Sequence, residues 1–164
     1  MFEVLVSKKK LIMPQYIDSY YLVDTRKLEI VYDFFLKYFP LGVEDLAIDY
    51  PFPEFSDSPE KIFHSVRELL LHLEDNLGYE YTIYFDNIDK SATIKQIILQ
   101  YTDDGKIIFG VSIIGNDPSS IQQIEIIKEI KNYLNSKDAF ATVEEIPPIN
   151  SSEFVEFCDE RYRI

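Results

Sequence analysis

The sequence predicts an α+β protein of one domain, residues 1–164, in which helices cover a mostly antiparallel sheet of about five strands. Aromatic and β-branched runs alternate with helical patterns, and a tight turn signal joins two consecutive strand candidates. The 46% of hydrophobic residues suffices for one core. Because the chain contains neither an internal repeat nor a Gly/Ser-rich linker, it gives no sign of a second domain.

The first part of the chain contains two short strand candidates and one helix. Residues 2–6 and 20–23 are aromatic and β-branched, which favours strands. A helix follows Asp24 or Thr25, either of which can cap it, and ends at Pro40. Its apolar side chains recur at helical spacing: Leu28, Val31, Tyr32, Phe35, Tyr38 and Phe39.

A proline-rich segment, residues 41–58, is expected to be an extended loop. The prolines in or beside it are Pro40, Pro51, Pro53 and Pro59. Ser58, Pro59 and Glu60 then place a cap, a first-turn proline and a first-turn acid in the order that suits a helix N-terminus. The sequence therefore predicts a second helix from Ser58 to about Asn76.

The middle of the chain carries the clearest strand signal. Strands are predicted at 79–85, 94–102 and 106–114, and Asp103-Asp104-Gly105 joins the last two as a hairpin. One hairpin face is uniformly apolar and should face the core: Ile97, Leu99, Tyr101, Ile107, Phe109, Val111 and Ile113. The other face is mixed: Gln96, Ile98, Gln100, Ile108, Gly110, Ser112 and Ile114. Either a loop covers this second face in part or a partner binds it.

The C-terminal part is predicted to contain two helices around one strand. Asp117-Pro118 opens a helix that runs to about Asn135. A strand follows at 140–146. Asn150 with Glu153 three residues later resembles a capping box and starts a short terminal helix.

The charge and composition restrict the classes of partner and the compartment. The net charge is −13, which argues against nucleic-acid binding because that affinity comes largely from Lys and Arg. No apolar run approaches the roughly 18 residues of a membrane span, and the surroundings of Lys8-Lys9-Lys10 lack a signal-peptide pattern. The single cysteine, Cys158, can form no intramolecular disulfide. These features predict a cytoplasmic protein without a membrane association.

No catalytic, cofactor-binding or metal-binding motif is recognisable, and the sequence favours a protein that is not an enzyme. His64, Glu68 and His72 share one predicted helix, but the histidines are eight residues apart, about 12 Å along the axis, too far to share an ion. A solvated polar face is the favoured interpretation. The segment 86–89 lacks the glycine and glutamate of a calcium loop. Cys158 suits a buried apolar position better than a nucleophile.

An acidic and aromatic segment is the candidate site. Residues 40–60 contain six acids and no Lys or Arg. Aromatic rings within an acidic rim suit an interface with a basic protein; alternatively, the rings tuck the loop onto the sheet. The candidate partner surface is Glu44, Asp45, Asp49, Tyr50, Phe52, Glu54, Phe55 and Asp57.

Several short motifs are spread over nearly the whole chain: Tyr20–Arg26, Asp49–Pro53, Tyr81–Tyr84, Tyr101–Gly105 and Glu145–Pro148. In these motifs the chain resembles small acidic, uncharacterised bacterial α+β proteins of the immunity-protein type. The resemblance implies a protein without catalysis that occupies the active site of a toxin or blocks its substrate path. The resemblance identifies no site residues in this chain.

Three functions remain open from the sequence. The first is an interaction protein, of the immunity type, whose acidic surface binds a basic toxin such as a nuclease. The second is a small-ligand-binding or enzymatic domain with a pocket between helices and sheet. The third is a scaffold in which the mixed hairpin face pairs with its own copy. The first accounts for the acidity and the missing catalytic motifs together, and we favour it.

Overall fold

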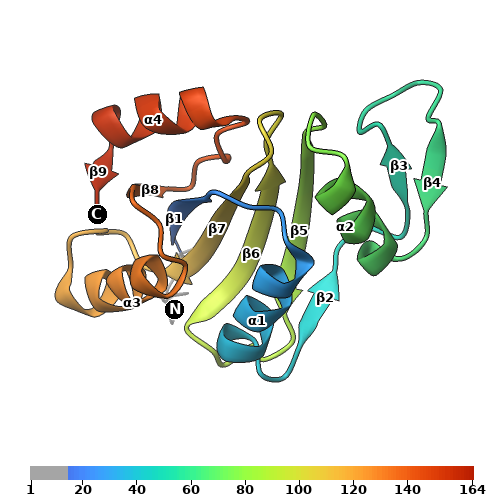
Figure 1. Ribbon diagram of the computed structural model, residues 1–164. Helices are drawn as coiled ribbons and strands as arrows, with labels where there is room; N and C mark the ends of the chain where they lie inside the picture. The colour runs from blue at the N-terminus through green and yellow to red at the C-terminus, as the bar shows by residue number, and fades with distance from the viewer. Residues whose placement is uncertain (1–14) are drawn as a thin grey trace, which may run out of the picture.

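A seven-stranded sheet forms the centre of the computed structural model, which describes residues 15–164 (Figure 1). The strand order is β2-β5-β6-β7-β1-β8-β9, and every neighbouring pair is antiparallel. The short strands β3 and β4 form a separate two-stranded sheet. The α+β prediction is confirmed, although the main sheet is larger than the predicted five or so strands. The strand predicted at 2–6 lies outside the described residues.

The elements have the following bounds. The strands are β1 (Tyr16–Val23), β2 (Val43–Asp45), β3 (Tyr50–Phe52), β4 (Lys61–Phe63), β5 (Tyr81–Asn87), β6 (Ile94–Tyr101), β7 (Ile107–Ile114), β8 (Ala139–Val143) and β9 (Tyr162–Arg163). The helices are α1 (Leu28–Tyr38), α2 (Val66–Asp75), α3 (Ile121–Tyr133) and α4 (Ser151–Glu160).

The start of the second helix is the main error of the sequence analysis. α2 begins at Val66 instead of Ser58, and the skipped residues Lys61–Phe63 pair with β3 as β4. Aromatic packing favours the strand here, because the ring centroids of Phe52 and Phe63 lie 4.4 and 5.1 Å from that of His72 on α2. The segment 41–58 is consequently no plain loop, since it contains β2 and β3.

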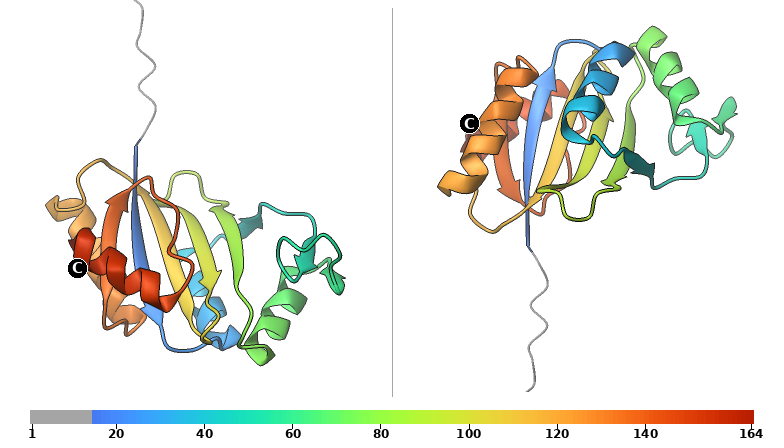
Figure 2. Two further views of the ribbon diagram at one scale, coloured as in Figure 1. Left: turned by 90° about the horizontal axis from the view of Figure 1, so that it is seen from above. Right: turned by 90° about the horizontal axis from the view of Figure 1, so that it is seen from below.

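The two faces of the main sheet are covered unequally. α1, α2 and α3 contribute to one large buried cluster with the predicted core face of the hairpin. α4 packs on the opposite face (Figure 2), where Phe154 and Cys158 contact a smaller cluster. The strand residues of that cluster are Tyr20, Ile98, Ile108 and Phe140. A helix, rather than the expected loop, therefore covers part of the mixed hairpin face, and Cys158 is buried among apolar side chains as predicted.

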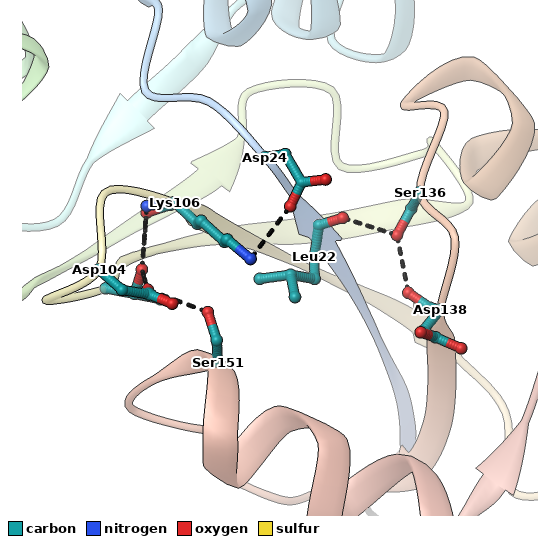
Figure 3. A network of polar contacts seen from close by, with 8 residues as sticks. Leu22, Asp24, Asp104, Lys106, Ser136, Asp138 and Ser151 are labelled. Atoms are coloured by element: carbon teal, nitrogen blue, oxygen red, sulfur yellow. Dashed lines mark hydrogen bonds and ion pairs between the residues drawn. The ribbon is translucent and has the colours of Figure 1, made fainter.

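Polar contacts hold the start of α4 against the β6–β7 hairpin (Figure 3). Ser151 donates a hydrogen bond of 2.9 Å to the Asp104 carboxylate in the hairpin turn. Nearby, Lys106 forms an ion pair of 3.2 Å with Asp24, which follows β1. The contact between Ser151 and Asp104 fixes the start of α4 beside the hairpin turn at one end of the sheet.

A buried arginine joins α2 to the hairpin without any acidic partner in the described part of the chain. Arg26 is 2% exposed. Its guanidinium donates to the carbonyl oxygens of Leu73, Asn76 and Tyr79 at 3.0, 2.8 and 2.7 Å, and also to that of Thr102. A cation at the C-terminal end of α2 is favourably placed relative to the helix dipole. Arg26 thus satisfies carbonyl groups that would otherwise be buried without donors.

Candidate functional site

The structure divides the predicted partner surface into exposed acids, one exposed ring and two buried rings. The exposed acids are Glu44, Asp45, Asp49 and Asp57, and Glu54 is half-buried. Phe55 is 89% exposed, whereas Tyr50 and Phe52 are only 4% and 3% exposed and belong to the large core cluster. Tyr50 and Phe52 therefore tuck the segment onto the core, and Phe55 alone of the three presents an aromatic ring to solvent.

Exposed aliphatic side chains lie among these acids, and sequence reasoning missed them. Ile48 is 90% exposed and Leu46 is 51% exposed. We call the combined set the loop surface: Glu44, Asp45, Leu46, Ile48, Asp49, Glu54, Phe55 and Asp57. The available signal was the pair of apolar residues between Asp45 and Asp49 in a segment without helical or strand periodicity. Together with Phe55, these exposed apolar side chains within residues 46–55 are candidates for contact with a partner.

Specific contacts hold the loop surface in place. β2 pairs with the end of β5, and β3 pairs with β4. The Tyr81 hydroxyl donates to the carbonyl oxygen of Pro51 at 2.8 Å, and the Thr82 N–H donates to the Glu54 carboxylate at 2.9 Å. Because the edge of β5 supplies both donors, the surface is anchored to the main sheet.

Phe55 adopts an uncommon backbone conformation. Its φ is +61°, in the left-handed region that bulky residues other than glycine rarely adopt. Such conformations cost of order 1 kcal/mol or more and cluster at functional positions. The exposed ring and the positive φ together single out Phe55 within the loop surface.

The two histidines are placed differently from the shared helical face that the sequence suggested. His64 precedes α2, and its Nδ1 lies 2.6 Å from Oδ1 of Asp49. His72 turns inward against Phe52, and its Nε2 is buried without a partner among residues 15–164. The expected solvated face is therefore wrong for His72. No cluster of three or more potential metal ligands occurs in this described range.

The acids of the loop surface form no ion pair with Lys or Arg within residues 15–164. Within residues 15–164, the only ion pair that involves one of them is the contact between Asp49 and His64. Burial raises the pKa of Glu54 to about 7, and the negative charge of Glu80 adds to this effect. Burial also raises the pKa of Asp45. These raised pKa values reduce the charge of Glu54 and Asp45, whereas the charges of Glu44, Asp49 and Asp57 are not offset by an ion pair with Lys or Arg within residues 15–164.

A second polar region crosses the sheet face that α4 leaves open. Strand register places six polar residues side by side in one row: Thr142, Asp18, Ser112, Gln96, Asp86 and Glu44. Ser112 donates a hydrogen bond of 2.6 Å to Asp18, and Gln96 donates one of 3.1 Å to Asp86. We call this set the polar row.

A pocket of about 330 Å³ lies over the polar row. It is lined by Tyr16, Asp18, Asp86, Lys95, Gln96, Ser112 and Glu144. Asp18 is 8% exposed, and burial raises the pKa of its carboxyl group. Sequence reasoning missed this convergence because its three acids come from β1, β5 and the segment after β8, and Asp18 lies before the strand predicted at 20–23.

Comparisons with known proteins identify one similar solved structure and no family. Neither a protein-family model nor a curated protein sequence matches the chain. Among solved structures, the chain is similar to one in the crystal structure of the toxic C-terminal tip of CdiA from Pseudomonas aeruginosa in complex with immune protein. The match has 14% identity and a TM-score of 0.37, and it covers 80% of this chain and 88% of that chain. A similarity of this extent carries no functional argument.

Among residues 15–164, no helix is long and apolar enough to cross a bilayer.

Proposed function

We propose that this chain is a non-catalytic, cytoplasmic protein that binds a basic protein through the loop surface, and that this partner is a bacterial toxin which it neutralises. The observation that carries the proposal is the exposure of Phe55 and Ile48 among carboxylates that have no local Lys or Arg partners. Apolar anchors within a polar rim are the usual anatomy of a protein interface.

The charge of the chain supports a basic partner. A net charge of −13 accelerates encounter with a positively charged protein and disfavours acidic partners. A toxin that acts on nucleic acid must itself bind phosphates, so its substrate path is basic. An acidic surface with a protruding ring is complementary to such a path, and its binding there would exclude the nucleic acid.

Neutralising three loop-surface acids should weaken the affinity for the partner by about tenfold to a hundredfold. The test variant combines Glu44→Gln, Glu54→Gln and Asp57→Asn, and the partner is first purified by capture on the wild-type chain. Charge pairs across interfaces contribute to both association rate and affinity, so the loss should shrink as salt screens the interaction. Isothermal titration calorimetry at low and high salt measures both effects.

A matched triple variant separates the loop surface from total charge. Asp33→Asn, Glu125→Gln and Glu156→Gln remove the same number of carboxyl groups, one Asp and two Glu, from exposed positions on α1, α3 and α4. The matched variant should retain affinity within about threefold, as is usual for charges outside the contact. Equal losses in the two variants, or a captured partner that is acidic, would exclude the loop surface as the binding site.

The pocket over the polar row favours a second candidate function, the binding of a small cationic ligand. Its volume of about 330 Å³ falls within the roughly 300–1,000 Å³ of ligand sites, and Asp18 provides a buried carboxylate. Agmatine or spermidine at 100 times its dissociation constant should stabilise the fold by about 2.7 kcal/mol. A thermal shift that Asp18→Asn abolishes would support this function, and the lack of any shift with both amines would count against it.

A further inference from the structure

A small pocket opens within the loop surface, between the segment around β3 and the edge of β5. Its volume is about 240 Å³, and its lining includes Asp49, Tyr50, Glu54, Phe55 and Tyr81. Sites for metabolite-sized ligands start at about 300 Å³. The pocket is therefore better matched to one side chain of a protein than to a free ligand.

The floor of this pocket holds a carboxyl group without a counter-ion. One Glu54 oxygen accepts the Thr82 N–H at 2.9 Å, and no Lys or Arg within residues 15–164 forms an ion pair with Glu54. Burial raises the pKa of Glu54 to about 7, and Glu80 contributes further negative charge. A cation that entered the pocket would stabilise the ionised carboxylate and lower this pKa.

Tyr50 also lines the pocket. It is 4% exposed, and its hydroxyl is closed to solvent beside the Asp45 carboxylate. Burial, the charge of Asp45 and a hydrogen bond to that carboxylate raise the pKa of Tyr50 to about 12, so the phenol stays neutral at physiological pH. The hydroxyl is therefore not a partner for an incoming group.

The walls of the pocket are apolar. Pro51 and the ring of Phe55 line it together with Tyr81. Lysine and arginine bury their methylene stems along apolar surface and keep the charged head in a polar environment. Aromatic rings add a favourable contact with a cation.

We infer that this pocket receives the side chain of a lysine or arginine from the basic partner, with Glu54 as counter-ion. The inference rests on the proposed function and specifies its central contact. An anionic group would meet Asp49 and Glu54 and is excluded by repulsion. A purely apolar side chain would leave the carboxylate without a counter-ion.

A titration of Glu54 by NMR tests the pocket without the partner. The chain carries 13C-labelled glutamate carboxyl groups, and the probes are Nα-acetyl-lysine methylamide and Nα-acetyl-arginine methylamide. At saturation either probe should lower the pKa of Glu54 by about one unit or more and shift the ring signals of Phe55 and Tyr81. Nα-acetyl-norleucine methylamide, which has an aliphatic stem without a charge, should leave the Glu54 titration unchanged.

Two outcomes of this titration would overturn the inference. One is a Glu54 pKa that neither cationic probe changes at its highest soluble concentration. The other is an equal response to the norleucine probe, which would show an apolar slot instead of a cation site. Glu54→Gln should weaken the affinity for the lysine and arginine probes at least tenfold, because it removes the counter-ion and keeps the side-chain shape. Glu125→Gln on α3 is the matched control and should bind the probes like the wild type.

The captured partner separates failure of the pocket from failure of the proposed function. Glu54→Gln alone should weaken the affinity for the partner at least tenfold, whereas Glu125→Gln should leave it unchanged. If the triple loop-surface variant weakens partner affinity but Glu54→Gln leaves that affinity unchanged, the pocket assignment is wrong and the proposed function stands. If the cationic probes bind at Glu54 while the triple variant leaves partner affinity unchanged, the pocket is supported as a cation site and the proposed function is lost.

Discussion

Replacing Arg26 with methionine should lower the free energy of unfolding by about 4 kcal/mol. The buried guanidinium serves four carbonyl oxygens, those of Leu73, Asn76, Tyr79 and Thr102. Each buried carbonyl that loses its donor costs about 1–3 kcal/mol, and part of this cost is recovered where water reaches the group. Methionine keeps much of the apolar stem, so the loss reports on the hydrogen bonds more than on packing.

Urea unfolding followed by circular dichroism measures this effect. Arg26→Lys keeps the charge but has one nitrogen where the guanidinium forks, so it should still lose about 2 kcal/mol. It also provides a readout if Arg26→Met does not fold. Arg67→Met is the control, because Arg67 is exposed and makes no hydrogen bond within residues 15–164; it should change stability by under about 1 kcal/mol. A loss below about 1 kcal/mol for Arg26→Met would show that the carbonyl groups find other donors.

Replacing Gly110 with alanine should cost about 2–3 kcal/mol, because a methyl group does not fit on this sheet face. The new Cβ would lie 2.6 Å from Cε1 of Tyr20 and 3.3 Å from Cβ of Ile98. The Tyr20 ring has no room to move, since it is fully buried, packs on Phe140 and donates a hydrogen bond of 2.5 Å to the Glu145 carbonyl. Overpacking of a filled core typically costs about 1–3 kcal/mol.

Gly78→Ala provides the control for this prediction. A Cβ at Gly78 would meet no heavy atom within 4 Å, so its effect should stay within about 0.5 kcal/mol. The urea concentration at the midpoint of unfolding is measured for both variants. When their m-values are equal, the difference between the midpoints reports the difference in stability. If Gly110→Ala is as stable as Gly78→Ala, then Tyr20 and α4 are less firmly packed on this face than the contacts indicate.

Local signals in the sequence were sufficient for several elements. Asp103-Asp104-Gly105 forms the turn between β6 and β7, where Gly105 has a φ of +83°. The predicted N-cap of α4 is present, since Asn150 accepts the Glu153 N–H at 2.9 Å, although the Glu153 carboxylate accepts the N–H of Ile149 and not that of Asn150. The apolar alternation also identified the core face of this hairpin correctly. In each case residues a few positions apart determine the structure.

Other features depend on contacts between distant residues and could not be predicted in this way. β1 lies between β7 and β8, which are far from it in the chain, so the sheet order was not accessible. The cap signal at Ser58 was overridden by the packing of Phe52 and Phe63 against α2. In the candidate site, the acidity of the loop was visible in the sequence, whereas the burial of Tyr50 follows only from tertiary packing.

Hydrogen–deuterium exchange of the chain with and without its captured partner tests the central claim most directly. Binding through the loop surface should slow amide exchange in residues 43–57 and along the adjoining edge of β5, while α3 exchanges at an unchanged rate. The same footprint should disappear with the triple loop-surface variant and persist with the matched triple. Protection confined to α3 and α4, with residues 43–57 exchanging as in the free chain, would contradict the account.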